Sequence, residues 1–251
     1  MPLISVITNQ EAIPVTSDLR GRPKLLLAVW TVLLAVFAAL APLVQDALNI
    51  PFDVFSVVML APLAASIIVW LRPSSFPWSW TGTSTRRLTQ STVFALIAVL
   101  TFSSILMLIS GRTPHFAGIN AGAPIVVFLG LQLLGAFAEE CGWRGVVQQT
   151  GEELARPAVV SAIAGFIFGA THLGYWGLGL VPVLIFALTT TFMSLTITTI
   201  FQGSLLQRLI PATIVHLGLN LIFATLDRGD NLGTTITSLG AAIVMFAVIF
   251  V

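Results

Sequence analysis

The stretch Pro157–Gln207 reads PAVVSAIAGFIFGATHLGYWGLGLVPVLIFALTTTFMSLTITTIFQGSLLQ, which is 51 residues without Asp, Glu, Lys or Arg. A helix that crosses a bilayer needs roughly 20 mostly apolar residues, so this stretch is long enough for two. Its middle, Gly174–Pro182, has three glycines and a proline within nine residues, and such clusters are typical of turns. The stretch therefore predicts two membrane-spanning helices joined by a turn.

Uncharged segments of similar length lie on both sides of this stretch, and they extend the prediction to the whole chain. The sequence has 251 residues, of which 57% are hydrophobic and only 8% are charged, whereas soluble domains carry roughly a quarter charged residues. No alternating strand pattern is present, so each span must be a helix that satisfies its own backbone hydrogen bonds. We predict an all-α, polytopic membrane helix bundle of about eight transmembrane helices; the other six segments are Leu25–Val44, Val54–Leu71, Leu88–Gly111, Thr113–Ala138, Leu209–Leu226 and Asn231–Val251.

The distribution of basic residues predicts the orientation of the chain. With eight spans, nine of the eleven Lys and Arg residues fall on the side that holds both termini, and basic loops favour the cytoplasm. We therefore expect a cytoplasmic tail over residues 1–24, followed by a single transmembrane domain over 25–251, in a plasma membrane. Leu25–Val44 is longer than the apolar core of a signal peptide and no cleavage signal is obvious after it, so we interpret it as a retained span. One lysine against ten arginines favours a bacterial source.

The overall composition excludes two other classes of protein. The formal net charge is +1, and no strongly basic segment suggests a nucleic-acid partner, so membrane lipid is the expected environment. Cys141 is the single cysteine, which rules out an internal disulfide and any cysteine-based metal site. We expect Cys141 to have a packing role. The sequence does not predict an oligomeric state.

Ionisable residues at membrane depth cost a few kcal/mol each and so mark functional sites. At the end of the fourth span lie Glu139 and Glu140, followed by Arg144. Glu140 and Arg144 are four residues apart on one helix face, where their charges can neutralise each other. Glu139 is rotated by about 100° from Glu140. We expect room for a water molecule or a peptide bond beside Glu139, because its helical neighbours are small: Gly135, Ala136 and Gly142.

Two of the three histidines also lie in predicted spans. His172 ends the fifth span, and His216 is followed at helical spacing by Asn220 in the seventh. His115 lies in a loop and is not a candidate. Taken singly, the acidic pair could be a solvated helix end, each histidine a packing residue and Asn220 an interhelical donor. Together they place most of the polar groups that could face the interior on three helices.

These residues form three ordered motifs, Glu139-Glu140-x-x-x-Arg144, Phe168-x-x-x-His172 and His216-x-x-x-Asn220, with a glycine after the arginine. The trio resembles the motifs of the CPBP family, the Abi group that contains type II CAAX prenyl proteases and bacteriocin-processing enzymes. The specific part of the resemblance covers about 80 residues, and the eight-helix layout extends it over most of the chain. The first three spans carry no mark of the family.

The resemblance implies an intramembrane endopeptidase that acts on a peptide or a membrane-anchored protein. By position, Glu139 would activate a water molecule with the help of His172, while His216 and Asn220 would stabilise the oxyanion. Glu140 and Arg144 would be supporting residues. We expect no cofactor. A divalent metal such as zinc is a second reading, because Glu139, His172 and His216 make a one-Glu, two-His set; the His-Glu-x-x-His helix of many zinc proteases is missing.

Two other functions compete with proteolysis. In a proton-coupled transporter the same glutamate and histidines would form a relay, although the paired, interrupted repeats common in transporters are not found here. A catalytically silent family member would act in bacteriocin self-immunity or as a scaffold for a membrane complex.

The two histidines raise a question of depth. At 1.5 Å per residue, a fifth span that starts near Pro157 would place His172 roughly 22 Å along its helix, but a seventh span that starts at Leu209 would place His216 only about 10 Å along. Residues that form one site must lie at the same depth in the membrane. We therefore expect the segment Gln148–Arg156 to dip into the membrane.

Overall fold

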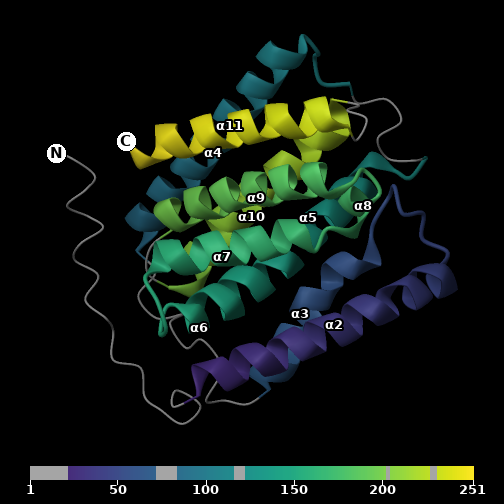
Figure 1. Ribbon diagram of the computed structural model, residues 1–251, viewed down its shortest axis with the longest axis vertical. Coiled ribbons are helices and arrows are strands. Elements are labelled where there is room, and N and C mark those ends of the chain that lie inside the picture. The colour runs from purple at the N-terminus through teal and green to yellow at the C-terminus, as the bar shows by residue number, and fades with distance from the viewer. Residues whose placement is uncertain (1–21, 72–83, 116–121, 202–203, 227–230) are drawn as a thin grey trace.

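The computed structural model describes residues 22–71, 84–115, 122–201, 204–226 and 231–251. All of the regular structure in these ranges is helical (Figure 1). Residues 1–21 of the predicted cytoplasmic tail lie outside the described ranges. The helices are α2 (Pro23–Leu48), η1 (Val57–Leu60), α3 (Ala61–Trp70), α4 (Thr85–Ser110), α5 (Ile125–Gly142), η3 (Trp143–Gln148), α6 (Gln149–Gly151), α7 (Pro157–Ala170), α8 (Leu173–Trp176), α9 (Leu180–Ile200), α10 (Leu205–Thr225) and α11 (Leu232–Phe250).

The polytopic helical bundle predicted from the sequence is confirmed. Within the described residues, six helices are long and apolar enough to cross a membrane: α2, α4, α5 with its continuation to Gly151, α9, α10 and α11. The other two predicted spans are the shorter apolar helices Val57–Trp70 and Pro157–Ala170. Helix α7 has 14 residues and so measures about 21 Å, less than the roughly 30 Å hydrocarbon thickness.

The predicted turn between the fifth and sixth spans is also present. Helix α7 ends at Ala170, and α9 starts at Leu180. Between them lie the single turn of α8 and Gly179, whose φ of +96° is a conformation that side chains disfavour. Thus the glycines of this segment reverse the chain, as the sequence indicates.

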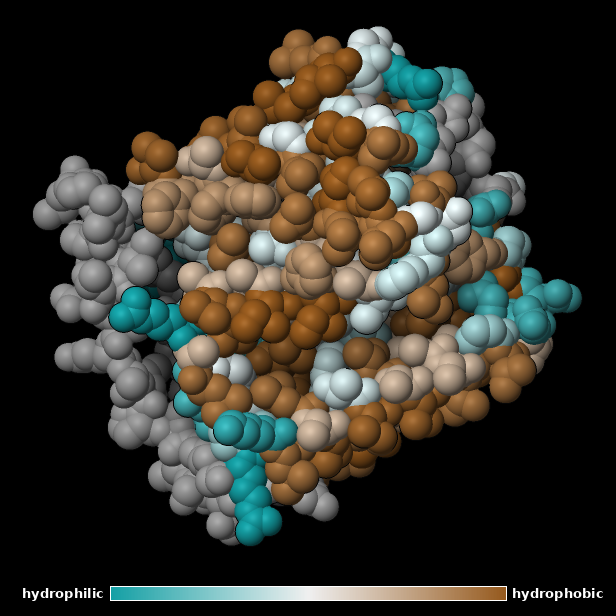
Figure 2. Space-filling model, viewed as in Figure 1, coloured by the Kyte–Doolittle hydropathy of each residue, from teal (hydrophilic) through white to brown (hydrophobic). Residues whose placement is uncertain are grey.

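The outer surface of the bundle is apolar. Large hydrophobic side chains are exposed along the outer faces of α2, α4, α5, α7, α9 and α11, including Leu43, Leu100, Val126 and Ile163. In Figure 2 the helix surfaces on the visible face are mainly brown, and the most hydrophilic residues gather towards its edges. Because such a surface is unfavourable in water and suits lipid tails, the chain is a membrane protein.

The two largest groups of buried side chains pack different helices together. One packs α4, α9, α10 and α11 around Phe102, Leu106 and Met245. The other packs α2, α3, η3 and α7 around Trp30 and Trp143, whose rings meet edge to face at 5.5 Å. Helices α5, α7, α9 and α10 lie centrally in Figure 1, between α4 and α11 on one side and α2 and α3 on the other. These four central helices carry the candidate site.

Small residues let α7 and α9 approach closely, which sets the position of the end of α7. A Cβ atom on Gly165 would lie 2.6 Å from Ser194 Cβ and 2.7 Å from the Thr190 carbonyl oxygen. Across the same contact, the Thr190 hydroxyl donates to the Gly165 carbonyl (2.8 Å), and the Ser194 hydroxyl donates to the carbonyl of Ser161 (2.8 Å). Close packing of small residues with interhelical hydrogen bonds is the usual way for helices to associate in lipid.

Candidate active site

The acidic pair lies inside the bundle rather than at a solvated helix end. Glu139 is 8% exposed and Glu140 only 2%, both on the last turn of α5. The predicted pairing of Glu140 with Arg144 is confirmed: Arg144 Nε lies 3.0 Å from Glu140 Oε2. The helix continues directly into η3, a π-helical segment that includes Arg144. Such segments are rare and often occur at functional sites, and no sequence pattern indicated this one.

His216 on α10 lies between the two glutamates. Its Nδ1 is 2.7 Å from Glu140 Oε1, and its Nε2 is 3.1 Å from Glu139 Oε2. A neutral imidazole can donate to only one of these carboxylates, whereas an imidazolium donates to both. With an imidazolium, His216 and Arg144 would balance the charges of the two carboxylates, which is how buried charges are best tolerated. His216 therefore joins α10 to the acidic turn of α5.

His172 lies between the end of α7 and the start of α8, at the N-cap position of α8. Its Nδ1 lies 2.9 Å from the carbonyl oxygen of Phe168. A carbonyl oxygen can only accept, so Nδ1 carries the hydrogen and Nε2 of the neutral ring has a free lone pair. Nε2 has no hydrogen-bonding partner within the described residues. The Nε2 lone pair of His172 is thus available to accept a hydrogen bond.

The structure brings His172 and His216 to the same level in a way that the sequence did not predict. Helix α10 starts at Leu205, four residues before the predicted start at Leu209, which moves His216 about 6 Å further along its helix. The ring of His172 turns back towards Phe168. Phe168 then contacts both imidazoles edge to face, at 4.6 Å from His172 and 5.7 Å from His216. The two histidines are level for these reasons, and the dip of Gln148–Arg156 stays a prediction.

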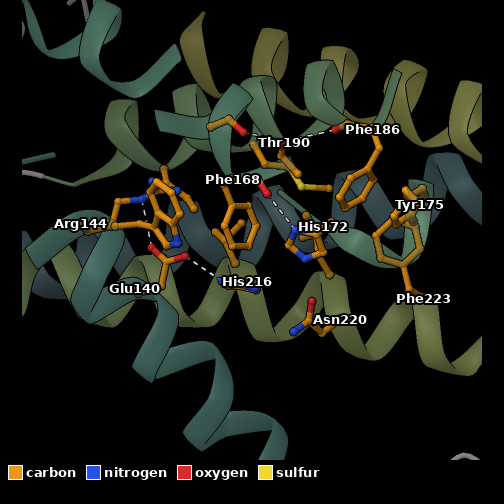
Figure 3. Close-up of a pocket in the computed structure, with 16 residues that line it drawn as sticks. Glu140, Arg144, Phe168, His172, Tyr175, Phe186, Thr190, His216, Asn220 and Phe223 are labelled. Atoms are coloured by element: carbon orange, nitrogen blue, oxygen red, sulfur yellow. Dashed lines mark hydrogen bonds and ion pairs between the residues drawn. The ribbon is translucent and has the colours of Figure 1, made fainter. Parts of the chain in front are cut away.

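A cavity of about 220 Å³ joins these groups (Figure 3). Glu140, Arg144, His172, His216 and Asn220 all line it, so α5 with η3, the end of α7 and α10 contribute side chains to one space. The Asn220 amide makes no hydrogen bond to any described residue and is free to bind a ligand. The rest of the lining is mostly apolar: Trp143, Gly165, Phe168, Tyr175, Phe186, Thr190, Met193, Ile197, Val215, Leu219 and Phe223.

Glu139 lies beside this cavity and is not part of its lining. Its Oε2 faces His216, while its Oε1 has no hydrogen-bonding partner in the described part of the chain. The expectation of open space beside Gly135 and Gly142 is wrong. A Cβ atom on Gly135 would lie 2.7 Å from the Met59 side chain, and one on Gly142 would lie 2.5 Å from Pro62. These glycines admit η1 and α3, and the open space of the site is the cavity that His216 lines.

The side chains do not form an evident metal site. In the described ranges, no three residues from His, Cys, Asp and Glu are grouped closely enough to hold a metal ion, and this includes the set Glu139, His172 and His216. Cys141 is 2% exposed and packs against Leu205 and Leu209, as its expected packing role requires.

One polar pair near the site was missed from the sequence. Arg208, at the start of α10, donates from both terminal nitrogens to Glu152, at 3.0 and 2.7 Å. Gln148 also donates to Glu152 (2.8 Å), and Arg208 lies over the ring of Phe201. Glu152 and Arg208 are 56 residues apart, so no local pattern could connect them. The pair ties α10 to the end of the helix that carries the glutamates.

Comparison with known proteins bears on the region that contains this site. The family model described as Type II CAAX prenyl endopeptidase Rce1-like matches residues 121–222. All three motifs lie inside this match. A search of curated proteins found no match to the chain. The match agrees with the resemblance of the motifs, and it supports a likeness of residues 121–222 to the Rce1-like type II CAAX prenyl endopeptidases.

Proposed function

We propose that this protein is an intramembrane endopeptidase that hydrolyses a peptide bond in a peptide or a membrane-anchored protein. The observation that supports this most strongly is the convergence of Glu140, Arg144, His172, His216 and Asn220 on one cavity, with Glu139 in contact with His216. These residues come from three separate segments of the region 121–222, and this region matches a family of endopeptidases. Their side chains supply a base and hydrogen-bond donors, which hydrolysis of an amide without a covalent intermediate requires.

In the proposed reaction, a water molecule lies near Glu139 and His172 and attacks the carbonyl carbon of the scissile bond. Its proton moves to this pair, either to the free oxygen of Glu139 or to Nε2 of His172. The carbonyl oxygen becomes the oxyanion of a tetrahedral intermediate. The C–N bond then breaks, and the same pair returns the proton to the leaving nitrogen, so the products are one carboxyl group and one amine. The free atoms of both residues support these roles.

The oxyanion is stabilised by donors on α10. Asn220 offers an uncommitted amide to the cavity and suits this role. His216 has both ring nitrogens facing carboxylates, so its donation to an oxyanion requires one of these contacts to open. In the state described here, we propose that His216 holds Glu139 and Glu140 in position. Glu140 and Arg144 support the arrangement through their ion pair.

Further parts of the proposal concern cofactors and location. We propose that the reaction needs no cofactor and that the protein functions in the plasma membrane of a bacterium, with residues 1–24 and the C-terminus in the cytoplasm. The single transmembrane domain would be 25–251. The substrate would then be presented to the site from the cytoplasmic side of the bundle.

The test compares the wild-type protein with Glu139→Gln and His172→Ala in liposomes. The substrates are membrane-anchored peptides with and without a prenyl group, and mass spectrometry identifies the products. Loss of a general base typically costs 100-fold or more, so both variants should lose nearly all cleavage while they keep their thermal unfolding temperature. His115→Ala is the matched control, because His115 is exposed and outside the site.

Other results would support a different function or different site residues. Full activity in both variants would refute the roles of Glu139 and His172. A wild-type protein that cleaves none of the peptides would favour the silent member that acts in self-immunity or as a scaffold. Uptake of a solute driven by a proton gradient, without proteolysis, would favour the transporter.

A further inference from the structure

Within the described ranges, the buried side-chain oxygens and nitrogens that lack a hydrogen bond gather around one segment of the chain. Four of them lie between residues 140 and 149: Glu140 Oε2, Arg144 Nε, Gln148 Oε1 and Gln149 Oε1. The fifth is Oγ1 of Thr213 on α10. Arg144 Nε and Glu140 Oε2 are 3.0 Å apart as an ion pair, but they are not aligned as a hydrogen bond. Buried polar atoms are costly without a partner, and buried water is the usual partner.

Most of these atoms belong to one polar stripe on the helix that continues from α5 through η3. Four residues of the stripe are spaced four apart and so share a helix face: Glu140, Arg144, Gln148 and Glu152. In a π-helix such as η3, hydrogen bonds join residues five apart, so Gln149 also falls near this face. The Gln148 amide donates to Glu152 (2.8 Å), which continues the stripe to the end of the helix. From residue 140 to residue 152 the stripe is roughly 18 Å long at 1.5 Å per residue.

The stripe joins the cavity to the surface of the bundle. At its inner end, Glu140 and Arg144 are buried and line the cavity. At its outer end, the side chains of Glu152 and its partner Arg208 are 16% and 13% exposed. Figure 1 shows α6 on the same side of the bundle as the start of α2 and the end of α11, which is the proposed cytoplasmic side. The stripe therefore leads from that surface to the site.

Helix α10 forms the facing wall of the stripe. It is held there at two points, because Arg208 bonds to Glu152 at 3.0 and 2.7 Å and His216 Nδ1 lies 2.7 Å from Glu140. Thr213 lies between these points and is 7% exposed. It precedes His216 by three residues and so shares the face that meets the glutamates. The Thr213 hydroxyl adds a donor and an acceptor to the polar atoms of the stripe.

The mixture of charges and polar atoms selects water as the ligand. The guanidinium of Arg144 repels a cation, and the carboxylates of Glu140 and Glu152 repel an anion. Water is neutral, and it both donates and accepts. It can donate to the oxygens of Gln148 and Gln149 and accept from Arg144 Nε, so it matches the unpaired atoms.

The remainder of the cavity suits the substrate rather than water. Figure 3 places Arg144 and Glu140 at one end of the cavity and Tyr175 and Phe223 at the other. The lining away from Arg144 is mostly aromatic and aliphatic, and apolar cavities hold water poorly. A peptide bound in this apolar part displaces what water is there, so the water that reacts must come from the polar end.

We infer that a chain of water molecules runs along this stripe, from Glu152 and Arg208 past Gln148 to Arg144 and Glu140, and delivers the water that hydrolysis consumes. Gln148 is then a positioning residue for water in the middle of the path. The use of this water rests on the proposed endopeptidase function, whereas the path itself does not.

The test uses water itself as the probe, so it does not depend on activity. Thr213→Cys places a thiol at the stripe, in a Cys141→Ala background that leaves it as the single thiol. Infrared spectroscopy then follows the exchange of S–H to S–D after transfer of the liposomes into D₂O. The matched control is Thr196→Cys, because Thr196 is fully buried on α9 and its hydroxyl bonds to the carbonyl of Phe192 on its own helix.

Two substitutions of Gln148 separate a water path from a structural role. Both remove its hydrogen bond to Glu152, but Gln148→Met fills the space with an apolar chain of similar length, whereas Gln148→Ala leaves the space open. The control for the first is Gln132→Met, the same change on the same helix at a residue that bonds to the carbonyl of Val54 and does not line the cavity. Thermal unfolding of each variant shows whether it is folded.

We expect the thiol of Thr213→Cys to exchange much faster than that of Thr196→Cys. Adding Gln148→Met should slow this exchange by about 10-fold, as for the loss of one hydrogen bond to water, and should lower kcat with little change in KM. Adding Gln148→Ala should leave the exchange at least as fast, with a smaller loss of kcat. Gln132→Met should change neither.

Three outcomes would overturn the inference. The first is exchange in Thr213→Cys as slow as in Thr196→Cys, which would mean that the stripe is dry. The second is exchange that Gln148→Met does not slow, because water would then enter from the cavity. The third is equal slowing by Gln148→Met and Gln148→Ala, which would indicate a structural role. If the exchange behaves as expected but no peptide is cleaved, the proposed function fails while the water path stands.

Discussion

Replacing Gly165 by alanine tests whether the close contact of α7 with α9 positions His172. The added Cβ would lie 2.6 Å from Ser194 Cβ and 2.9 Å from Thr191 Cα, whereas ordinary contacts are 3.4–4 Å. Two of the three nearest atoms belong to the backbone of α9, so no rotation of a side chain relieves the overlap. The helices must separate by about 0.8 Å, and the hydrogen bond from Thr190 to the Gly165 carbonyl must lengthen.

Overpacking of a tight interface costs roughly 1–3 kcal/mol of unfolding free energy. His172 lies seven residues beyond Gly165, and its position depends on the end of α7. A misplacement of about 1 Å at a reacting group lowers a rate by as much as 100-fold. We therefore expect Gly165→Ala to lower kcat by roughly 10- to 100-fold, with a smaller change in KM.

The assay is peptide cleavage in liposomes, with thermal unfolding of the same preparations. Gly130→Ala is the control, because Gly130 lies on α5, the helix that carries the glutamates, and a Cβ there meets nothing within 4 Å. The control should be fully active and as stable as the wild type or slightly more, since alanine favours a helix by about 1 kcal/mol over glycine. Unchanged stability and kcat in Gly165→Ala would refute the reasoning.

Three further predictions concern other parts of the molecule. A double-mutant cycle with Glu152→Gln and Arg208→Gln should give a coupling energy of about 1–3 kcal/mol in thermal or denaturant unfolding, because the pair is bidentate and mostly buried; a coupling near zero would mean that the contact is solvated. Cys141→Ala should cost about 1 kcal/mol of stability and leave kcat unchanged, and maleimide should label Cys141 only after unfolding; rapid labelling of the folded protein would contradict its burial. Treatment with 1,10-phenanthroline or EDTA should leave cleavage unchanged, and a loss of activity that added zinc restores would support the metal reading.

Much of the fold follows from local sequence. The uncharged runs predicted each apolar helix, and the glycines near Gly174 and Gly179 predicted the chain reversal before α9. The predicted starts of the helices were less accurate. Helix α10 begins at Leu205 because Ser204 and Gln207 form a capping box, a signal that the charge-based division at Arg208 overlooked.

The sequence also supplied the candidate residues, but it predicted only some of the contacts between them. The pair Glu140 and Arg144 is four residues apart on one helix, so its spacing determines the contact. By contrast, the spacing of His216 gives no reason for it to meet Glu139 and Glu140, which lie on another helix. The space beside the glycines near Glu139 could not be predicted for the same reason, because the residues that fill it come from η1 and α3.

The sequence by itself determined that this is a membrane-embedded helical protein with a glutamate, two histidines and an asparagine in family motifs. Composition and helical periodicity are properties of neighbouring residues, and they suffice for that. Only the tertiary structure decided that His216 lies between both glutamates, and that Nε2 of His172 has no hydrogen-bonding partner among the described residues. These features depend on how α5, α7 and α10 pack against one another, because residues far apart in the chain meet only when the helices associate.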